Sequence, residues 1–367
     1  MRRVLFVDRG GTLVQERQSL ADSLEHRPLV SGVIPALLKL KAAGYEFVIV
    51  TNQGGLGSPD FPRAAYERAD ELLLDLFASQ GIRFAANFIC PHLPEAHCTC
   101  RKPGIGLVRD FVNAAPLDRE RSAMVGDRDT DLEFAANLGI QGFKLVTKLP
   151  AIPAGFDDVS GWVRGQVDAS LTRLGVKGVY GVLLHRPEQL FESHGRAIYQ
   201  ALQGLKEAGQ VQKVGVSIYA PSELEALTPR YRFDLIQAPF NLVDRRLHAT
   251  GWLRRLKDEG IEIHTRSAFL QGLLLMPQAT RPAKFSSWSE LWRAWHEWLS
   301  RHNVSALQVC LAFPLSFSEI NRVVVGADSV SQLREIITAV TSSAQVDFPD
   351  LHCEAENLIN PFLWSHL

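Results

Sequence analysis

Three apolar runs in the first 131 residues are each followed by a short polar motif, and this arrangement is what most constrains the fold. The runs end at Val7, Val50 and Val125, and each is typical of a buried parallel strand. The motifs that follow them are Asp8-Arg9-Gly10-Gly11-Thr12, Thr51-Asn52-Gln53 and Gly126-Asp127-Arg128-Asp129-Thr130-Asp131. An open parallel sheet binds its ligands outside the carboxyl ends of its strands. The first two motifs therefore place Asp8 and Thr51 where a ligand crevice is expected.

Strand and helix patterns alternate along the whole chain, which indicates an α/β protein. In the first part we expect helices at Ile34–Ala43 and Pro62–Gln80, ended by Gly44 and Gly81. The strands expected there are Val4–Val7, Phe47–Val50, Phe84–Ile89, Ala123–Val125 and Gly142–Val146. Those expected in the second part are Tyr180–Leu184, Val211–Ser217, Leu235–Gln237, Ile261–His264 and Val323–Val325. No linker rich in Gly, Ser or Pro separates the two parts.

Composition narrows the class of protein. A chain of 367 residues is long enough for two domains with separate cores. Its net charge of -1 gives no basic field for nucleic acid or an anionic membrane. No apolar run approaches the roughly 20 residues of a membrane span. The few apolar residues before Asp8 form a run too short for the apolar region of a signal peptide, so we expect none there. Three of the 5 cysteines fall within residues 90–100, a distribution typical of a metal loop. We therefore expect a cytoplasmic protein.

In order and content the three motifs resemble the haloacid dehalogenase superfamily of phosphatases, which use an aspartate nucleophile. The resemblance implies a three-layer domain with an open parallel sheet over residues 1–144. It also implies that Asp8 forms an aspartyl-phosphate, and that Thr51 and Asn52 donate hydrogen bonds to the phosphate oxygens. Lys102 would supply positive charge. Mg²⁺ would be held by Asp8, Asp127 and the backbone carbonyl of Gly10.

Two positions depart from that pattern. The family carries a second Asp two residues after the nucleophile, which protonates the leaving alkoxide and then activates water, and this chain has Gly10 there. A positioned acid or base contributes about 10²–10⁴-fold to the rate, so we expect an impaired enzyme. Asp129 is an alternative base, although its position is also explained by the architecture of the phosphate site. Gly54 stands where histidinol-phosphate enzymes carry Asp.

A cysteine-rich loop makes the resemblance more specific. Cys90, His92, Cys98 and Cys100 give the pattern Cys-x-His-x5-Cys-x-Cys, whose thiolates and imidazole can wrap a structural Zn²⁺. The alternative is a loop of free thiols, because a disulfide between Cys98 and Cys100 has poor geometry. We expect His97 not to be a ligand. The loop and Thr51–Gly57 look like histidinol-phosphate phosphatase, and heptose bisphosphate phosphatases share the zinc loop.

The second part resembles a different family. Leu183-Leu184-His185-Arg186-Pro187, Val214-Gly215-Val216-Ser217 and Ile236-Gln237-Ala238-Pro239-Phe240-Asn241 follow one another as in an aldo-keto reductase entered part-way. That family is a (β/α)₈ barrel that uses NADPH. The resemblance implies an incomplete barrel over residues 145–345, without the first two strands, and a C-terminal tail at 346–367. It implies that Lys148 is the catalytic lysine and that His185 orients the substrate. It places Ser217, Gln237 and Asn241 near the nicotinamide, and Gly326, Ser329 and Gln332 near the adenosine phosphate.

The incomplete barrel raises two expectations. The catalytic Asp and the proton-donating Tyr of the family have no counterpart, which argues against reductase activity, and we expect Tyr219 to be a packing residue. Trp288, Trp292, Trp295 and Trp298 recur at helical spacing, and we expect them to form a packing stripe against the sheet. The open sheet edges would need cover from the first domain, from the tail Phe348–Leu367, or from self-association with a partner chain.

The leading hypothesis is a Mg²⁺-dependent hydrolase of a small-molecule phosphate ester with a structural Zn²⁺, of the histidinol-phosphate phosphatase type and impaired by Gly10. One alternative is a non-catalytic protein that binds a phosphometabolite or a nucleotide. The others are a heptose bisphosphate phosphatase and an NADPH-linked carbonyl reductase.

Overall fold

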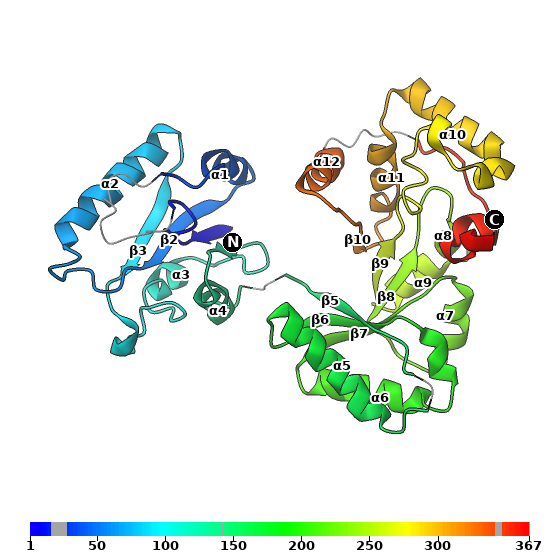
Figure 1. The fold of residues 1–367 in the computed structure, drawn as a ribbon, viewed down its shortest axis with the longest axis horizontal. Coiled ribbons are helices and arrows are strands. Elements are labelled where there is room, and N and C mark those ends of the chain that lie inside the picture. Colours follow the sequence, from blue (N-terminus) through cyan, green and yellow to red (C-terminus); the bar gives the residue numbers. More distant parts are fainter. Residues whose placement is uncertain (16–27, 141–142, 154, 342–346, 367) are drawn as a thin grey trace. The chain divides into compact units, whose positions relative to one another are not determined.

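The computed structural model describes residues 1–15, 28–140, 143–153, 155–341 and 347–366 (Figure 1). The chain divides into two compact units, Met1–Phe143 and Lys144–Leu367. Each unit has its own parallel sheet, and each is described by itself.

The first unit is built on an open sheet in which the described strands follow the order β3-β2-β1-β4. All neighbouring strands are parallel. In the centre of the sheet Val7 pairs with Ile49 on one side and with Val125 on the other, so these strands end at one edge. The elements of the unit are β1 (Val4–Val7), α1 (Val33–Ala42), β2 (Glu46–Asn52), α2 (Arg63–Ser79), β3 (Phe84–Cys90), the 3₁₀ turn η2 (Pro94–Ala96), α3 (Arg109–Ala114), β4 (Ala123–Val125) and α4 (Asp129–Asn137).

Alternation along the central strands gives the unit its three layers. Leu5 and Val7 of β1 join a core formed with α1 and α2, whereas Val4 and Phe6 join a second core that includes Phe134 of α4. Successive side chains of a strand point to opposite faces, so a strand buried on both faces is apolar throughout. Helices α1 and α2 cover one face of the sheet, and α3 and α4 cover the other (Figure 1). The expected three-layer architecture is confirmed.

One strand expected in this sheet does not belong to it. We predicted a strand at Gly142–Val146, but Gly142 lies outside the described residues and Phe143–Leu145 form no strand. Val146 instead begins β5 (Val146–Leu149), which pairs with the next strand in the second unit. The apolar run does indicate extended chain, but a short run carries no signal for which sheet it joins.

The second unit contains a wholly parallel sheet in the order β10-β9-β8-β7-β6-β5. Among the described residues β10 and β5 each pair on one side only, so the sheet does not close. This agrees with an incomplete barrel. After β5, its main elements are α5 (Val159–Leu174), β6 (Val179–Leu184), α6 (Gly195–Glu207), β7 (Val211–Ser217), α7 (Ser222–Leu227), β8 (Leu235–Pro239), α8 (Arg246–Ala249), α9 (Trp252–Asp258), β9 (Glu262–Arg266), α10 (Ser289–His302), α11 (Ala306–Leu315), β10 (Arg322–Val323), α12 (Val330–Thr341) and α13 (Glu356–Ile359). Its 3₁₀ turns are η3 (Pro187–Phe191), η4 (Gln278–Thr280), η5 (Ala283–Trp288) and η6 (Pro361–His366).

The core of this unit includes the C-terminal tail. Leu351, Leu358 and Ile359 are buried in the same cluster as the strands, and the backbone N–H of Cys353 donates to the Val243 carbonyl at 3.0 Å. The four tryptophans also belong to this cluster, with Trp292 and Trp295 buried and the other two partly buried against it. Their role in packing agrees with the prediction, although Trp288 ends η5 and only the other three lie in α10.

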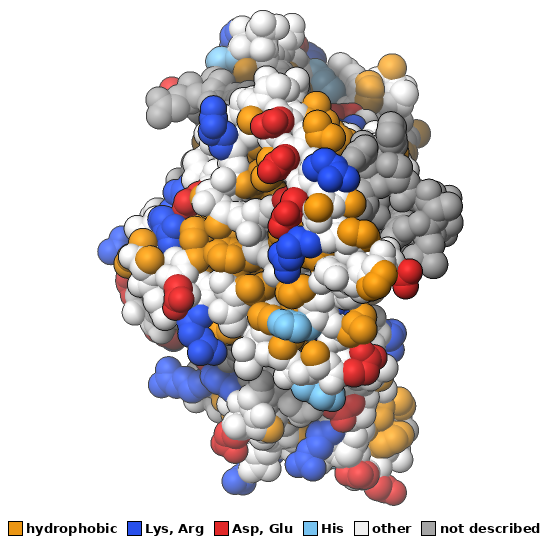
Figure 2. All heavy atoms as spheres, turned by 90° about the vertical axis from the view of Figure 1, so that its left-hand side faces the viewer, with side chains coloured by type: hydrophobic (Ala, Val, Ile, Leu, Met, Phe, Trp, Pro, Cys, Tyr) orange, Lys and Arg blue, Asp and Glu red, His pale blue; other side chains and the backbone are white. Residues whose placement is uncertain are grey.

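The surface is mixed in charge. On the face shown in Figure 2, the described Lys and Arg side chains are interspersed with Asp and Glu, as the small net charge leads one to expect. No described helix is both long enough and apolar enough to span a lipid bilayer.

Candidate functional site

A cavity of about 390 Å³ lies at the carboxyl edge of the first sheet. Its walls include Asp8 directly after β1, Thr51 near the end of β2, Lys102 in the loop after the cysteines, and Asp131 in the first turn of α4. All four side chains are at least nine-tenths buried. The structure thus brings Asp8, Thr51 and Lys102 together, as the sequence predicted.

Lys102 links two carboxylates. Its Nζ atom lies 2.6 Å from Oδ1 of Asp8 and 2.6 Å from Oδ1 of Asp131. Burial raises the pKa of Asp8, although the ammonium of Lys102 acts in the opposite direction. A buried charge needs a partner, so this ion pair explains how a carboxylate is kept in a largely dehydrated site.

Asn52 contacts Lys102 through the backbone. The Asn52 side chain donates to the Lys102 carbonyl at 3.1 Å and accepts from the Lys102 N–H at 2.9 Å. This pair of bonds fixes the loop that carries the lysine. In the structure the Asn52 amide is thus engaged with the backbone, whereas we expected it to face a phosphate. Thr51 accepts a hydrogen bond from Nε2 of Gln53 at 3.0 Å.

Three carboxylates converge beside the cavity. One oxygen from each of Asp8, Asp127 and Asp131 lies within 4.8 Å of the other two. Hard oxygen ligands of this kind suit Mg²⁺, so the donor set fits the metal that the resemblance implies. The sequence reasoning named Asp8 and Asp127 but missed Asp131. Asp131 is the third residue of α4, which begins at Asp129, and an acidic residue at this position commonly caps the start of a helix. In the structure its Oδ2 accepts a hydrogen bond from the Arg128 N–H at 3.1 Å.

Two glycines allow these carboxylates to approach the backbone. A Cβ at Gly11 would lie 2.1 Å from Oδ2 of Asp127, and the φ of Gly11 is +72°. A Cβ at Gly126 would lie 2.1 Å from Oδ2 of Asp131. A side chain at either position would displace the carboxylate beside it, and at Gly11 the positive φ also favours glycine.

Gly10 differs from these two. It lines the cavity, no described atom lies within 4 Å of the Cβ it would carry, and its φ is outside the left-handed region. A Cβ can therefore be added at this position without displacing the described neighbours. Gly54 is tighter, since its Cβ would meet the end of Leu93 at 3.1 Å and Arg101 at 3.5 Å.

The cysteine loop brings four side chains to one point. Cys90, His92, Cys98 and Cys100 form a single group of potential ligands, in which His97 is not included. The distances between their ligand atoms run from 3.1 Å, for His92 Nδ1 to Cys100 Sγ, to 3.7 Å, for Cys90 Sγ to Cys98 Sγ. A tetrahedral zinc with bonds of about 2.3 Å to sulfur requires sulfur atoms about 3.8 Å apart. The group therefore fits a zinc ion.

The thiols in this loop differ in acidity. Burial raises the pKa of Cys90 to about 12. Burial acts in the same direction on Cys98, but hydrogen bonds from Cys100 and from the backbone of Arg101 outweigh it and lower the pKa of Cys98 to about 6. The loop thus favours a thiolate at Cys98, the form that binds a metal.

A buried ion pair behind the nucleophile was not anticipated. Nε of Arg9 donates to Oδ1 of Asp70 at 3.1 Å, and the guanidinium lies 5.0 Å from the centre of the Tyr66 ring. Asp70 also accepts from Asn87 at 2.5 Å. Because Arg9 follows Asp8 directly, this network ties the loop after β1 to α2 and β3.

In the second unit, several predicted residues lie at the carboxyl ends of adjacent strands. Nζ of Lys148 donates to Oγ of Ser217 at 3.2 Å, and this hydroxyl lies 3.5 Å from Oε1 of Gln237. His185 follows β6, and its backbone N–H donates to the Leu149 carbonyl at 3.1 Å. The structure therefore gathers these four residues.

Tyr219 has a contact that was not expected. Its ring packs against Phe362 and under the Arg266 guanidinium, as a packing residue would. Its hydroxyl, however, lies 3.4 Å from Nε2 of His185. The sequence did not predict this contact, because it depends on the conformation of the loop after β7.

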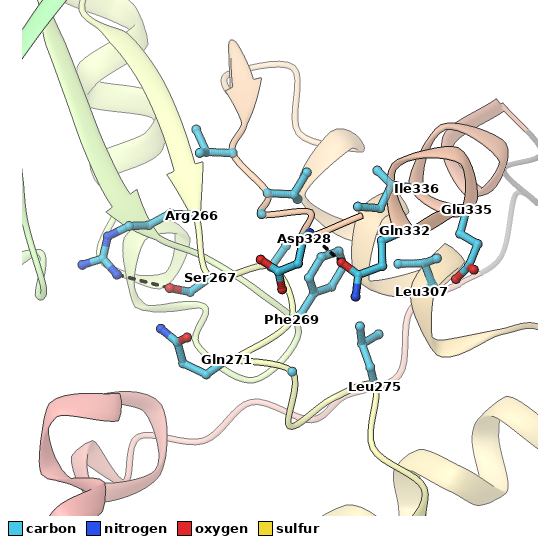
Figure 3. Close-up of a pocket in the computed structure, with 15 residues that line it drawn as sticks. Arg266, Ser267, Phe269, Gln271, Leu275, Leu307, Asp328, Gln332, Glu335 and Ile336 are labelled. Carbon is cyan, nitrogen blue, oxygen red and sulfur yellow. Dashed lines mark hydrogen bonds between the residues drawn. The ribbon is translucent and has the colours of Figure 1, made fainter. Parts of the chain in front are cut away.

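A larger cavity, of about 630 Å³, begins at Arg266 and Ser267 and extends to Asp328, Gln332 and Glu335 (Figure 3). Gly326 and Gln332 line it, whereas Ser329 accepts from the Gln332 N–H at 3.1 Å. Asn241 is buried and bonded to three backbone groups, the Ser267 carbonyl and the N–H groups of Val243 and Asp244.

This lining does not fit NADPH well. Asp328 and Glu335 lie at the end that we expected to receive the adenosine phosphate, and Arg266 lies at the other end (Figure 3). Carboxylates repel a phosphate, and among the described residues that line the cavity the one cation is Arg266. The charges of this cavity therefore do not match those of the cofactor that the resemblance implies.

Comparison with known proteins relates each part of the chain to a protein family. The sequence model of the aldo/keto reductase family matches residues 140–347, more than half of the chain. The chain belongs to the aldo/keto reductase family. A HAD-hydrolase-like model matches residues 99–147, so the two matches overlap only over 140–147. The chain is therefore a haloacid dehalogenase-like phosphatase segment joined to an aldo-keto reductase domain, as the two resemblances implied.

The curated relatives are bifunctional proteins of histidine biosynthesis. The protein from Legionella pneumophila (strain Lens) is 50% identical over 141 residues, which cover 38% of this chain and 40% of that protein. The protein from Xylella fastidiosa (strain M23) is 51% identical over 148 residues, which are 40% of each chain. The chain thus spans about 40% of the length of the relatives it matches.

Two solved structures are similar to part of this chain. An aldo-keto reductase from Bacillus halodurans is 20% identical, with a TM-score of 0.46, over 55% of this chain and 67% of that one. A HAD-like phosphatase from Mesorhizobium loti is 26% identical, with a TM-score of 0.34, over 42% of this chain and 77% of that one.

Proposed function

We propose that the first unit is a Mg²⁺-dependent phosphomonoester hydrolase that works through an aspartyl-phosphate on Asp8 and is slowed by Gly10. The observation that carries the proposal is the buried Asp8 carboxylate, paired with Lys102 at 2.6 Å, in a cavity at the carboxyl edge of a parallel sheet. Phosphoryl transfer needs a nucleophile in line with the leaving group and cations around the transferred oxygens, and this cavity supplies both.

The residues divide the reaction between them. An oxygen of Asp8 attacks phosphorus while the bond from phosphorus to the ester oxygen breaks. Lys102 and the Thr51 hydroxyl stabilise the charge that develops on the phosphoryl oxygens. Asp8, Asp127 and Asp131, together with the Gly10 carbonyl, would hold Mg²⁺, which would supply further positive charge. Asn52 acts by fixing the Lys102 loop through its two hydrogen bonds.

The departing alkoxide lacks a proton donor. A residue at position 10 would face the cavity, and glycine has no side chain to give a proton or to activate water for the second step. We therefore propose that binding is preserved while turnover is slow. Asp131 also lines the cavity, but Lys102 already pairs with it.

We propose histidinol phosphate as the substrate and Zn²⁺ as a structural metal in the cysteine loop. The identity of about 50% to proteins of histidine biosynthesis supports the substrate, and the group of Cys90, His92, Cys98 and Cys100 supports the metal. We assign the phosphatase function to residues 1–144 and propose that residues 145–345 form the reductase-like part.

Phosphate release from histidinol phosphate with Mg²⁺ tests the proposal, with the chain as it stands compared with its Gly10→Asp variant. Little release from the first and a gain of about 10² or more in the second are expected, since only the acid/base group is restored. The Cβ of the new residue meets no described atom within 4 Å. A second change, Asp8→Asn in the Gly10→Asp background, should abolish the gain because it removes the nucleophile.

Two other outcomes would change the conclusion. Efficient release with Gly10 in place would contradict the impaired-enzyme proposal and require another proton-transfer group. If neither protein releases phosphate but inorganic phosphate binds in a Mg²⁺-dependent manner, a non-catalytic phosphometabolite-binding protein would be favoured. That second candidate is favoured by one observation, the glycine at position 10.

A further inference from the structure

The cavity of about 630 Å³ in the second unit lacks the charges of an NADPH site, but its walls carry features that suit another ligand. Its volume lies within the range of about 300–1,000 Å³ that small-molecule and cofactor sites have. At Gly272 and Gly326, which both line it, an added Cβ would meet no described atom within 4 Å. A ligand can therefore reach the backbone at two points of the wall.

One wall of the cavity is the loop that follows β9, and its backbone is shaped to bind an anion. Ser267, Leu270 and Gln271 have left-handed backbone conformations, with φ of +62°, +45° and +53°. Backbone turns of this kind form concavities in which N–H groups bind phosphate and other anions. The N–H groups of four lining residues have no acceptor in the described part of the chain: Ala268, Phe269, Gln271 and Gly272.

Two residues at the start of this loop strengthen the case for an anion. Ala268 is only 2% exposed, and a buried backbone N–H without an acceptor is uncommon because it costs free energy. Arg266 lines the same cavity, and its guanidinium donates to Oγ of Ser267 at 3.2 Å and to the Ile218 carbonyl at 3.0 Å. These bonds hold a positive charge beside the unpaired N–H groups. This end of the cavity therefore suits a diphosphate.

The side of the cavity formed by α12 is unfavourable for a further phosphate. The N–H of Gln332 donates to Oγ of Ser329 at 3.1 Å, and the N–H of Asp328 donates to Oε1 of Gln332 at 2.7 Å. The start of α12 thus uses its own side chains to satisfy these two donors. Asp328 and Glu335 also place two carboxylates in the wall (Figure 3).

Carboxylates in such a wall distinguish between two kinds of ribose. A carboxylate accepts hydrogen bonds from the free hydroxyl groups of a ribose, whereas a phosphate on the ribose needs a cation such as arginine. Phe269, Leu307 and Ile336 add apolar surface to the same cavity, which suits the flat face of a base. The walls therefore match a diphosphate, an unphosphorylated ribose and a base.

We propose that this cavity binds a nucleoside diphosphate whose ribose carries free hydroxyl groups, and that it rejects the same compound with a phosphate on that ribose. Arg266 and the loop after β9 bind the diphosphate, and Asp328 and Glu335 accept hydrogen bonds from the ribose. The proposal concerns the second unit by itself and does not depend on the phosphatase function proposed for the first.

NADH and NADPH test this on the full chain, because they differ only by the phosphate on the adenosine ribose. In calorimetric titrations at low ionic strength we expect NADH to bind at least about 10-fold more tightly, since the carboxylates repel the added phosphate. The preference should shrink in about 0.5 M salt, which screens exposed charges. ADP-ribose should also bind, because it keeps the diphosphate and the adenosine ribose.

Two sets of variants separate the two sides of the cavity. The double variant Asp328→Asn, Glu335→Gln should bring the affinity for NADPH to within about threefold of that for NADH, because the repulsion is gone. Glu290→Gln removes an exposed carboxylate that does not line the cavity, and it should leave the preference unchanged. Arg266→Gln should weaken the binding of all three ligands, because each carries the diphosphate.

Three results would overturn the proposal. The first is NADPH binding to the unmodified chain as tightly as NADH does, or more tightly. The second is the failure of both NADH and ADP-ribose to bind at about 1 mM, which corresponds to a very weak site. The third is a preference for NADH that persists in the double variant, since the two carboxylates would then not be its cause.

Discussion

The Nζ atom of Lys102 lies 2.6 Å from Oδ1 of Asp8, so the proposed nucleophile is buried together with a cation from a loop 94 residues further along the chain. This contact joins the motif after β1 to the loop that follows the cysteines. The nucleophile and the charge that would stabilise the transferred phosphoryl group are thus positioned by one ion pair.

Replacing this lysine should strongly reduce phosphatase activity. In the Gly10→Asp background, Lys102→Met should lower kcat/KM by about 10²–10³, because a preorganised cation at the developing charge is lost. Without the ammonium, the pKa of Asp8, already raised by burial, should rise further. Phosphate release across a range of pH measures both effects. Lys41→Met removes an exposed lysine from the same unit and serves as the control. A loss of less than about threefold for Lys102→Met would contradict the role given to this side chain.

Substitution by alanine at two neighbouring glycines should affect the free energy of unfolding differently. Gly11→Ala places a methyl group 2.1 Å from the Asp127 carboxylate at a φ of +72°, and it should lower the free energy of unfolding by about 1–3 kcal/mol. Gly10→Ala has open space and should change that free energy by no more than about 0.5 kcal/mol. Urea unfolding of the two variants checks the difference. Equal stability of both would show that the loop rearranges freely, against the close approach seen at Gly11.

Zinc content should depend on the cysteine loop alone. The purified chain should contain about one zinc per molecule, and Cys100→Ser should lose it, because a hydroxyl is a far poorer zinc ligand than a thiolate. Cys353→Ser, which removes a thiol from the second unit, should leave the zinc content unchanged. Elemental analysis after dialysis measures this. Full zinc retention in Cys100→Ser would rule out the four-ligand site.

The second unit should lose stability in acid through Glu262. Burial acts to raise the pKa of this carboxyl, but hydrogen bonds from Lys213, Tyr180 and His264 outweigh it and lower the pKa to about 2. A carboxyl whose pKa is lower in the folded protein stabilises the fold above its unfolded pKa of about 4.5, and this contribution disappears as the pH falls toward 2.

The variant Glu262→Gln should therefore be less stable than the parent near neutral pH, by about 1–2 kcal/mol after allowance for solvent screening. The difference should shrink between about pH 4.5 and 2, where the parent loses the same contribution. Urea unfolding at several pH values gives the comparison, and Glu290→Gln, which removes an exposed carboxylate, is the control. A difference that does not depend on pH would refute the assignment.

Much of the local structure could be predicted because its signals are local. The alternation of apolar residues indicated β1 and β2, and Pro62 and Gly81 bounded α2 closely. The motif spacing also indicated the cavity residues Asp8, Thr51 and Lys102, since the carboxyl ends of parallel strands share one edge.

Other features could not be read from the sequence, because they depend on where distant segments meet. Asp131 joins the carboxylates only because α4 begins beside β4, and Asn52 contacts a backbone 50 residues away. Likewise, the strand assigned to Gly142–Val146 in the first sheet was wrong, since a short apolar run does not encode its pairing partner.

The sequence by itself determined the alternating α/β pattern, the order of the motifs and the change from one family to the other near residues 140–147. These follow from periodicity and residue chemistry, which neighbouring residues already define. Only the tertiary structure decided that Lys102 bridges Asp8 and Asp131, and that Tyr219 lies beside His185. The physical reason is that burial and charge–charge distances, and hence the reactivity of these groups, are set by packing between elements far apart in the chain.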